Sequence, residues 1–312
     1  MSGQIPILDL TTQGAGETDH LIAEFRAAYS DVGFAYIVNH GIDPDLTRAV
    51  FDASRRFHAL PIKTKTAIAL DRNHRGYIAI DTSTDVNSTL AEVKKPNQSA
   101  SFMMMRDELH DPARYLSGPN QWPDLSNFRE PVEAYNAALT QLGQRLMCLA
   151  LAACDAPSTA IKTFDRPTTW LRLLHYPPMP PQSPDDLYGS APHTDFGCLT
   201  ILAQDDVGGL QVRSPGGNWI DVPPLENAFI VNVGDMLHAM SNGQLRSTPH
   251  RVINRSGRER YSCPFFYDPD VAATVAPLPG TGTPKFAPRN FGDFLRSELE
   301  AGYDAHKPPA EN

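Results

Sequence analysis

Hydrophobic residues change their spacing about halfway along the chain. In the first half they recur every three or four positions over residues 18–30, 43–57 and, most clearly, 127–153. This spacing predicts amphipathic helices, each with one apolar face packed on a core. The pair Asp43-Pro44 favours a helix start, because Asp caps a helix and Pro is tolerated in its first turn.

The second half has a different pattern, in which short apolar runs are separated by Gly, Pro, Asn and Asp. The predicted strands cover residues 170–176, 199–203, 210–212, 219–222, 228–233 and 260–267, after two earlier runs at 5–10 and 33–41. Many short strands at close spacing are typical of an antiparallel sandwich or barrel. We therefore expect an α+β fold with a mainly β core. A helix-rich region, 1–157, should pack on a core region, 158–312, that ends in a helix over 291–299.

Composition restricts the classes of partner. The 312 residues are 41% hydrophobic and 20% charged, with a net charge of −9, which disfavours a nucleic acid or an anionic membrane. No signal peptide or membrane span is expected from the apolar runs. The four cysteines form no Cys-X-X-Cys pair, which is typical of reduced thiols and favours a cytoplasmic protein.

The candidate chemistry lies in the strand-rich half. His193 and Asp195 are two residues apart, so on a strand their side chains would project from one face. With the later His250 they give two histidines and one carboxylate, the set that holds non-haem iron(II) with positions left open. Arg260 and Ser262 share the same alternation and could together bind a carboxylate.

Each of these features is weak when taken singly. A lone His-X-Asp occurs by chance in many proteins, and most histidines are packed or exposed residues rather than ligands. The ordered set, with a distant third ligand followed by Arg-X-Ser, favours the metal interpretation. We expect Thr194 and Phe196, on the opposite strand face, to serve packing. Phe265 either faces the cavity or packs in the core.

These landmarks resemble the isopenicillin N synthase-like family of iron(II)/2-oxoglutarate-dependent dioxygenases over nearly the whole chain. The resemblance is carried by residues 5–10, 33–41, 193–195, 209–212, 231–235, 241–243, 247–252 and 260–266. It implies a double-stranded β-helix, the cupin-like jelly roll, with helices around it and iron(II) at its open mouth. It also implies that the iron ligands are His193, Asp195 and His250.

The same resemblance implies how 2-oxoglutarate is held. Arg260 and Ser262 would bind its distal carboxylate, and Tyr176 falls where the family often places a tyrosine that reaches the same group. Many relatives have Asn two residues before that tyrosine, whereas this chain has Leu174. An amide contact to the cosubstrate is therefore not expected from this position.

The implied activity is oxidation of a small molecule by iron(II), 2-oxoglutarate and O2, with succinate and carbon dioxide as co-products. The oxidation could be a hydroxylation, a desaturation or a cyclisation. One alternative is an iron oxidase like isopenicillin N synthase, which uses no 2-oxoglutarate and would hold its substrate's carboxylate with Arg260 and Ser262. A non-catalytic barrel and a zinc hydrolase rank lower. Substrate selectivity would come from residues 75–85, residues 102–105 and the carboxy-terminal helix.

Overall fold

The computed structural model describes residues 4–11, 15–84, 95–180, 182–184, 186–303 and 306. The strands are β1 (Ile7–Asp9), β2 (Phe34–Val38), β3 (Gly76–Ile78), β4 (Ala100–Met105), β5 (Thr168–Tyr176), β6 (Ser190–His193), β7 (Leu199–Gln204), β8 (Leu210–Arg213), β9 (Trp219–Asp221), β10 (Phe229–Val233), β11 (His250–Val252), β12 (Arg260–Asp268), β13 (Thr274–Val275) and β14 (Arg289–Asn290). The helices are α1 (Ala15–Asp31), α2 (Pro44–His58), α3 (Ile62–Thr66), α4 (Arg129–Ala153), α5 (Asp235–Met240), α6 (Phe291–Gly302) and the 3-10 helix η1 (Ser158–Phe164).

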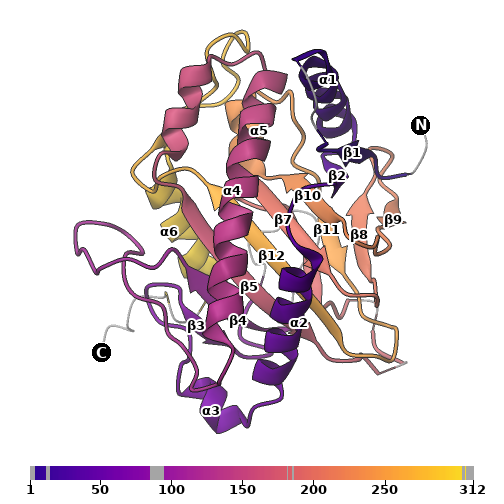
Figure 1. Cartoon of the computed structure of the whole chain (residues 1–312), viewed down its shortest axis with the longest axis vertical. Helices are drawn as coiled ribbons and strands as arrows, with labels where there is room; N and C mark the ends of the chain where they lie inside the picture. Colours follow the sequence, from indigo (N-terminus) through magenta and orange to yellow (C-terminus); the bar gives the residue numbers. More distant parts are fainter. Residues whose placement is uncertain are drawn as a thin grey trace.

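Two sheets form the centre of the molecule (Figure 1). In the described part of the chain, the larger has eight strands in the order β1-β2-β10-β7-β12-β5-β4-β3, and the smaller has the order β6-β11-β8-β9. Apolar side chains from both sheets, among them Tyr176 on β5 and Val212 on β8, share one buried cluster between them. This is the jelly-roll arrangement that the family resemblance implied.

The helices of the first half cover the outer face of the large sheet. Figure 1 shows α2 and α4 crossing in front of its strands. On α4 the predicted apolar stripe is buried, including Val132, Tyr135 and Leu139. The core on this side of the sheet joins these helices to the strands through residues such as Phe57 and Phe265. None of the described helices is long and apolar enough to cross a membrane.

The helix-rich half also supplies strands. β2 pairs with β10, and β4 pairs with β5, so segments on both sides of residue 157 share one sheet. The sequence predicted neither β3 nor β4. In β4 all six residues are buried, so its apolar run shows no alternation between an inner and an outer face. The segment 75–85, expected to contribute to substrate selectivity, contains β3; residue 85 lies outside the described residues.

Candidate active site

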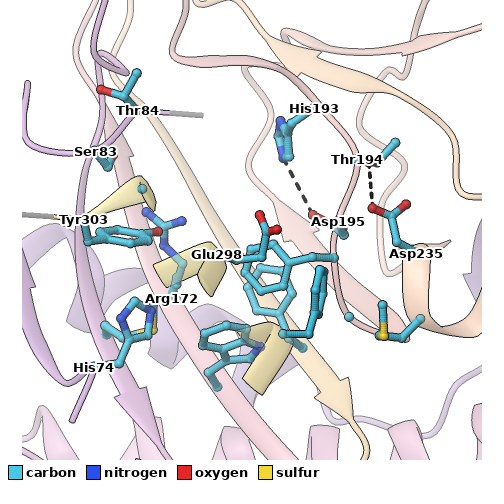
Figure 2. A pocket seen from close by; sticks show the side chains of 18 of the residues that line it. His74, Ser83, Thr84, Arg172, His193, Thr194, Asp195, Asp235, Glu298 and Tyr303 are labelled. Atoms are coloured by element: carbon cyan, nitrogen blue, oxygen red, sulfur yellow. Dashed lines mark hydrogen bonds and ion pairs between the residues drawn. The ribbon is translucent and has the colours of Figure 1, made fainter. Parts of the chain in front are cut away.

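Three possible metal ligands come together at the edge of the small sheet. His193 on β6 and His250 on β11 lie directly opposite each other in the antiparallel pair, with their ring centroids 4.3 Å apart. Oδ1 of Asp195 lies 3.6 Å from Nε2 of His193 and 3.7 Å from Nε2 of His250. One donor atom from each residue lies within 4.8 Å of the others. Figure 2 shows the side chains of His193 and Asp195 pointing toward each other.

Asp195 is positioned differently from our expectation. Strand β6 ends at His193, so the two side chains do not meet through strand alternation. The loop that carries Asp195 is instead tied to the start of α5, where the backbone N–H of Asp235 donates to the Asp195 carbonyl at 2.7 Å. The Oδ2 atom of Asp195 accepts hydrogen bonds from Thr200 on β7 and, at 2.7 Å, from Asn232 on β10. These two bonds leave Oδ1 directed at the histidines.

The orientation of both imidazoles is set by backbone carbonyls. Nδ1 of His193 lies 2.7 Å from the Ala191 carbonyl, and Nδ1 of His250 lies 3.3 Å from the Thr248 carbonyl. Because a carbonyl can only accept, each Nδ1 carries a proton, so in the neutral ring each Nε2 presents a lone pair. This is the tautomer that a metal ligand requires.

The surroundings of the Asp195 carboxyl favour its ionised form. Its burial favours the neutral acid, but His250, His193 and the Asn232 hydrogen bond outweigh that effect and hold the pKa below its ordinary value. A carboxylate oxygen and two imidazole nitrogens that converge on one point fit a divalent cation. The donor set therefore matches iron(II) on its own chemistry.

Behind the ligand loop lies a second buried carboxylate, Asp268 on β12. It accepts hydrogen bonds from the Cys198 backbone N–H at 2.6 Å and from the Trp170 indole at 3.2 Å. Burial raises the pKa of Asp268 to about 7. Gly197 lies so close to this carboxylate that any Cβ there would collide with it.

Arg260 lies between the sheets, fully buried. Its Nε donates to the Gly208 carbonyl at 2.5 Å, Nη1 to Ser262 Oγ at 3.3 Å and Nη2 to Gln204 Oε1 at 3.2 Å. Its guanidinium lies 4.6 Å from the ring centroid of Tyr176, its opposite neighbour on β5. Among the described residues, no carboxylate lies within 4.0 Å of it. A buried charge of this kind is stabilised by an incoming anion.

Leu174 occupies the position next to this cluster. On the sheet it lies between Ser262 of β12 and Ser101 of β4, and its side chain is buried among apolar neighbours. It offers no polar contact to a cosubstrate. Ser262, Tyr176 and Arg260 thus form the polar group at this end of the barrel.

His193 and Asp195 also line a cavity of about 390 Å³, whereas Arg260 and Tyr176 do not. All three segments expected to set selectivity contribute to its wall, with Thr84, Met103 and Phe294 among the lining residues. One expectation is corrected here, because Thr194 and Phe196 line the cavity rather than serving packing only. Of the two positions left open for Phe265, the structure shows the core, while its neighbour Phe266 lines the cavity.

Sequence reasoning missed the residues that position the ligands. Asn232 and Thr200 hold Asp195, and Asp268 holds the loop behind it. A usable signal was present for Asn232, because it is a lone amide inside the apolar run 228–233. Buried polar groups require partners, so such a residue indicates a hydrogen-bonded site.

Comparison with known proteins identifies the class. The sequence model of the 2OG-Fe(II) oxygenase superfamily matches residues 167–269, and that of the amino-terminal region of a non-haem dioxygenase in morphine synthesis matches residues 5–125. The chain belongs to the 2OG-Fe(II) oxygenase superfamily. It is an iron(II)- and 2-oxoglutarate-dependent dioxygenase that acts on a small molecule.

Individual relatives extend over nearly the whole length. A 2-oxoglutarate-Fe(II) type oxidoreductase, hxnY of Emericella nidulans, is 35% identical over 96% of this chain and 90% of its own. A full-length Neurospora crassa protein, solved with alpha-KG and thymine, has a TM-score of 0.84 at 28% identity, covering 95% of this chain and 96% of its own. JOX2, solved with 2OG, Fe and JA, has a TM-score of 0.79 at 29% identity, covering 96% of this chain and 89% of its own.

Proposed function

We propose that His193, Asp195 and His250 bind the iron(II) of this dioxygenase. The observation that carries the proposal is the convergence of their three donor atoms within 4.8 Å of one another. The carbonyls at Nδ1 and the hydrogen bonds on Oδ2 of Asp195 pre-orient these donors before any metal arrives. Ligands fixed in this way bind a metal with little loss of conformational freedom.

Arg260, Ser262 and Tyr176 would hold the distal carboxylate of 2-oxoglutarate. Support comes from the buried guanidinium of Arg260, which has hydrogen-bond partners but no carboxylate at ion-pair distance among the described residues. An arginine presents planar donors that match a carboxylate, and burial strengthens the pairing. Leu174 adds only apolar contact to this site.

The chemistry that iron(II) supplies with 2-oxoglutarate and O2 is the oxidation of a C–H bond, with succinate and carbon dioxide as co-products. The chain's own residues orient the reactants. His193 and Asp195 form one wall of the 390 Å³ cavity, so a substrate held there lies beside the proposed iron ligands. Aromatic side chains such as Phe196 and Phe266 line the same cavity and exclude water from around the substrate.

The cavity is suited to a small organic molecule. The Neurospora crassa protein was solved with thymine and JOX2 with JA, and we propose a ligand of similar scale for this chain. We also propose that the enzyme is cytoplasmic, since its four cysteines are free thiols. The net charge of −9 is consistent with a partner that is neither nucleic acid nor membrane.

The test measures cosubstrate turnover. Anaerobically purified protein is loaded with iron(II) and 2-oxoglutarate, O2 is admitted, and succinate is measured against a His193→Ala variant. We expect succinate from the wild type and none above background from the variant. Equal succinate from both would contradict the ligand assignment. If 2-oxoglutarate gave neither succinate nor a change in the iron spectrum, the binding site proposed at Arg260 would be wrong.

A further inference from the structure

A second arginine faces the reaction site from the same strand as Tyr176. Arg172 lies on β5 two residues before Leu174 and four before Tyr176, so strand alternation places all three on one face. It lines the 390 Å³ cavity together with His193 and Asp195, whereas Arg260 does not. Figure 2 shows Arg172 in the cavity wall near Tyr303 and His74. The barrel thus offers one arginine at the proposed cosubstrate end and another in the cavity.

The hydrogen bonding of Arg172 is incomplete. Its Nη2 donates to Ser101 Oγ at 3.2 Å, while its buried Nε has no hydrogen-bond partner. Within the described residues no carboxylate lies within 4.0 Å of its guanidinium, and this includes Glu298 on the cavity wall. A partly buried guanidinium with an unsatisfied N–H is costly unless a ligand completes it.

One titratable neighbour of Arg172, His74, does not supply a negative charge. His74 also lines the cavity, and its burial, the adjacent His306 and the charge of Arg172 hold its pKa well below the ordinary value. His74 therefore stays neutral beside Arg172. No carboxylate of the described residues lies at ion-pair distance from Arg172, so an anionic ligand in the cavity would balance its charge.

The rest of the wall favours a flat ring. The Trp170 ring lies 5.6 Å from Phe196 and 5.3 Å from Phe266, and Phe196 lies 6.4 Å from Phe294, all centroid to centroid. All four rings line the cavity. Aromatic surfaces at these separations accept another ring in stacked or edge-to-face contact.

We propose that the primary substrate is a small aromatic carboxylic acid whose carboxylate pairs with Arg172. Its ring would lie among Trp170, Phe196 and Phe266, which brings its C–H bonds toward the side of the cavity formed by His193 and Asp195. Arg172 is then a specificity-determining residue for the reaction. The inference rests on the proposed function, because it assigns the oxidised molecule to the cavity beside the iron ligands.

The experiment compares acids with their neutral amides. Benzoate, phenylacetate and cinnamate are titrated anaerobically into the protein carrying iron(II) and 2-oxoglutarate, and the visible absorption of the iron complex reports binding. We expect at least one acid to bind at or below about 20 mM and to bind about 10-fold more tightly than its amide. No acid-dependent change up to about 20 mM, or an amide that binds as well as its acid, overturns the inference.

Variants then locate the carboxylate. We expect Arg172→Met to weaken binding of the acid about 30-fold or more. The affinity of Arg172→Lys should lie between those of the wild type and Arg172→Met, because lysine keeps the positive charge but loses the planar pair of donors. Arg289→Met is the matched control. Arg289 also lines the cavity, but it is exposed and stacks on Phe294 at 4.8 Å, so its loss should change affinity by less than about 3-fold. Equal loss of affinity in Arg172→Met and Arg289→Met would mean that the acid is attracted by the overall positive charge and not paired with Arg172. That result would overturn the inference.

Failure of the inference and failure of the proposed function give different results. If wild-type protein shows no spectral change with iron(II) and 2-oxoglutarate, the proposed function fails and the substrate inference falls with it. If that change is present but acids do not perturb it, only the substrate inference is wrong. If Arg172→Met weakens 2-oxoglutarate binding rather than binding of the acids, Arg172 belongs to the cosubstrate site and the inference is also overturned.

Discussion

Asn232 donates a hydrogen bond from Nδ2 to Oδ2 of Asp195 at 2.7 Å. The amide comes from the middle of β10 in the large sheet, while the carboxylate follows β6 of the small sheet. The Thr200 hydroxyl on β7 bonds to the same oxygen. The large sheet therefore fixes the carboxylate that completes a ligand set otherwise made by the small sheet.

This relationship predicts that Asn232→Ala weakens iron(II) binding without removing a ligand. Losing the bond lets the carboxylate rotate away from the histidines, and residues that orient a metal ligand in this way typically contribute about 10- to 100-fold to affinity. Anaerobic titration with iron(II) measures the effect. Thr200→Ser, which keeps its hydroxyl, is the control and should stay near wild-type affinity. An Asn232→Ala protein with unaltered affinity would show that the bond is not needed.

Asp195→Ala should remove both bound iron and succinate formation. It deletes the only carboxylate of the proposed triad, so two neutral imidazoles would remain to hold a divalent ion. Metal analysis of the purified protein and the succinate assay check the two effects separately. Asp206→Ala is the matched control, because Asp206 is exposed and pairs with Arg258 on the surface. Stoichiometric iron in the Asp195→Ala protein would remove Asp195 from the ligand set.

The residues of the proposed triad could be picked out of the sequence because chemistry restricts which side chains bind iron. Few residues bind iron, and His193, Asp195 and His250 come in an order that chance seldom produces. Their geometry could not be predicted, since Asp195 is placed by a loop bonded to Asp235 rather than by strand alternation. Long-range contacts of this kind leave no local pattern in a sequence.

Two other features escaped prediction for physical reasons. Strand β4 is buried on both faces, so its apolar run lacks the period of two by which a strand is recognised. Arg172 sits inside the apolar run 170–176, where a charged residue is usually solvated on the outer face. Only the fold shows that this side chain points into the cavity.

Arg260→Lys should weaken 2-oxoglutarate binding about 10-fold or more. Lysine keeps the charge but loses the planar donors that match a carboxylate and that stack on Tyr176. The dissociation constant is measured anaerobically from the absorption of the iron complex. Arg258→Lys serves for comparison, because Arg258 is exposed and only two residues away. If both variants bound the cosubstrate as the wild type does, the distal carboxylate would lie elsewhere.

Gly197→Ala should lower the melting temperature and iron affinity together. A Cβ at this position would collide with the Asp268 carboxylate. That carboxylate is kept in place by the hydrogen bonds it accepts from the Cys198 N–H and the Trp170 indole. Shifting the loop would displace Asp195, and overpacking at such a site costs about 1–3 kcal/mol. Gly216→Ala is the control, since the nearest heavy atom to a Cβ there is Ser214 Oγ at 3.8 Å. Equal melting temperatures for the two variants would contradict the close-contact argument.

Because of the buried His58 on α2, we expect the folded protein to lose stability in mild acid. It is buried, its Nε2 lies 2.9 Å from the Leu173 carbonyl, and its Nδ1 has no hydrogen-bond partner. Burial lowers the pKa of His58 to about 3, against 6.5 for an ordinary histidine. Below about pH 6.5, His58 therefore binds a proton in the unfolded chain but not in the folded chain. The stability contributed by the neutral ring is present above that pH and is lost as the pH falls from 6.5 toward 3.

The test compares wild type with His58→Gln, in which a non-titrating amide can still donate to the Leu173 carbonyl. Between about pH 7.5 and about pH 5.5, the free energy of unfolding should fall by about 1 kcal/mol more in the wild type than in the variant. Urea denaturation at the two pH values measures it. His20→Gln is the control, because the His20 side chain is 75% exposed on α1. The free energy of unfolding of this variant should fall in acid by as much as that of the wild type. If the His58→Gln protein lost as much stability in acid as the wild type, proton uptake elsewhere would account for the loss.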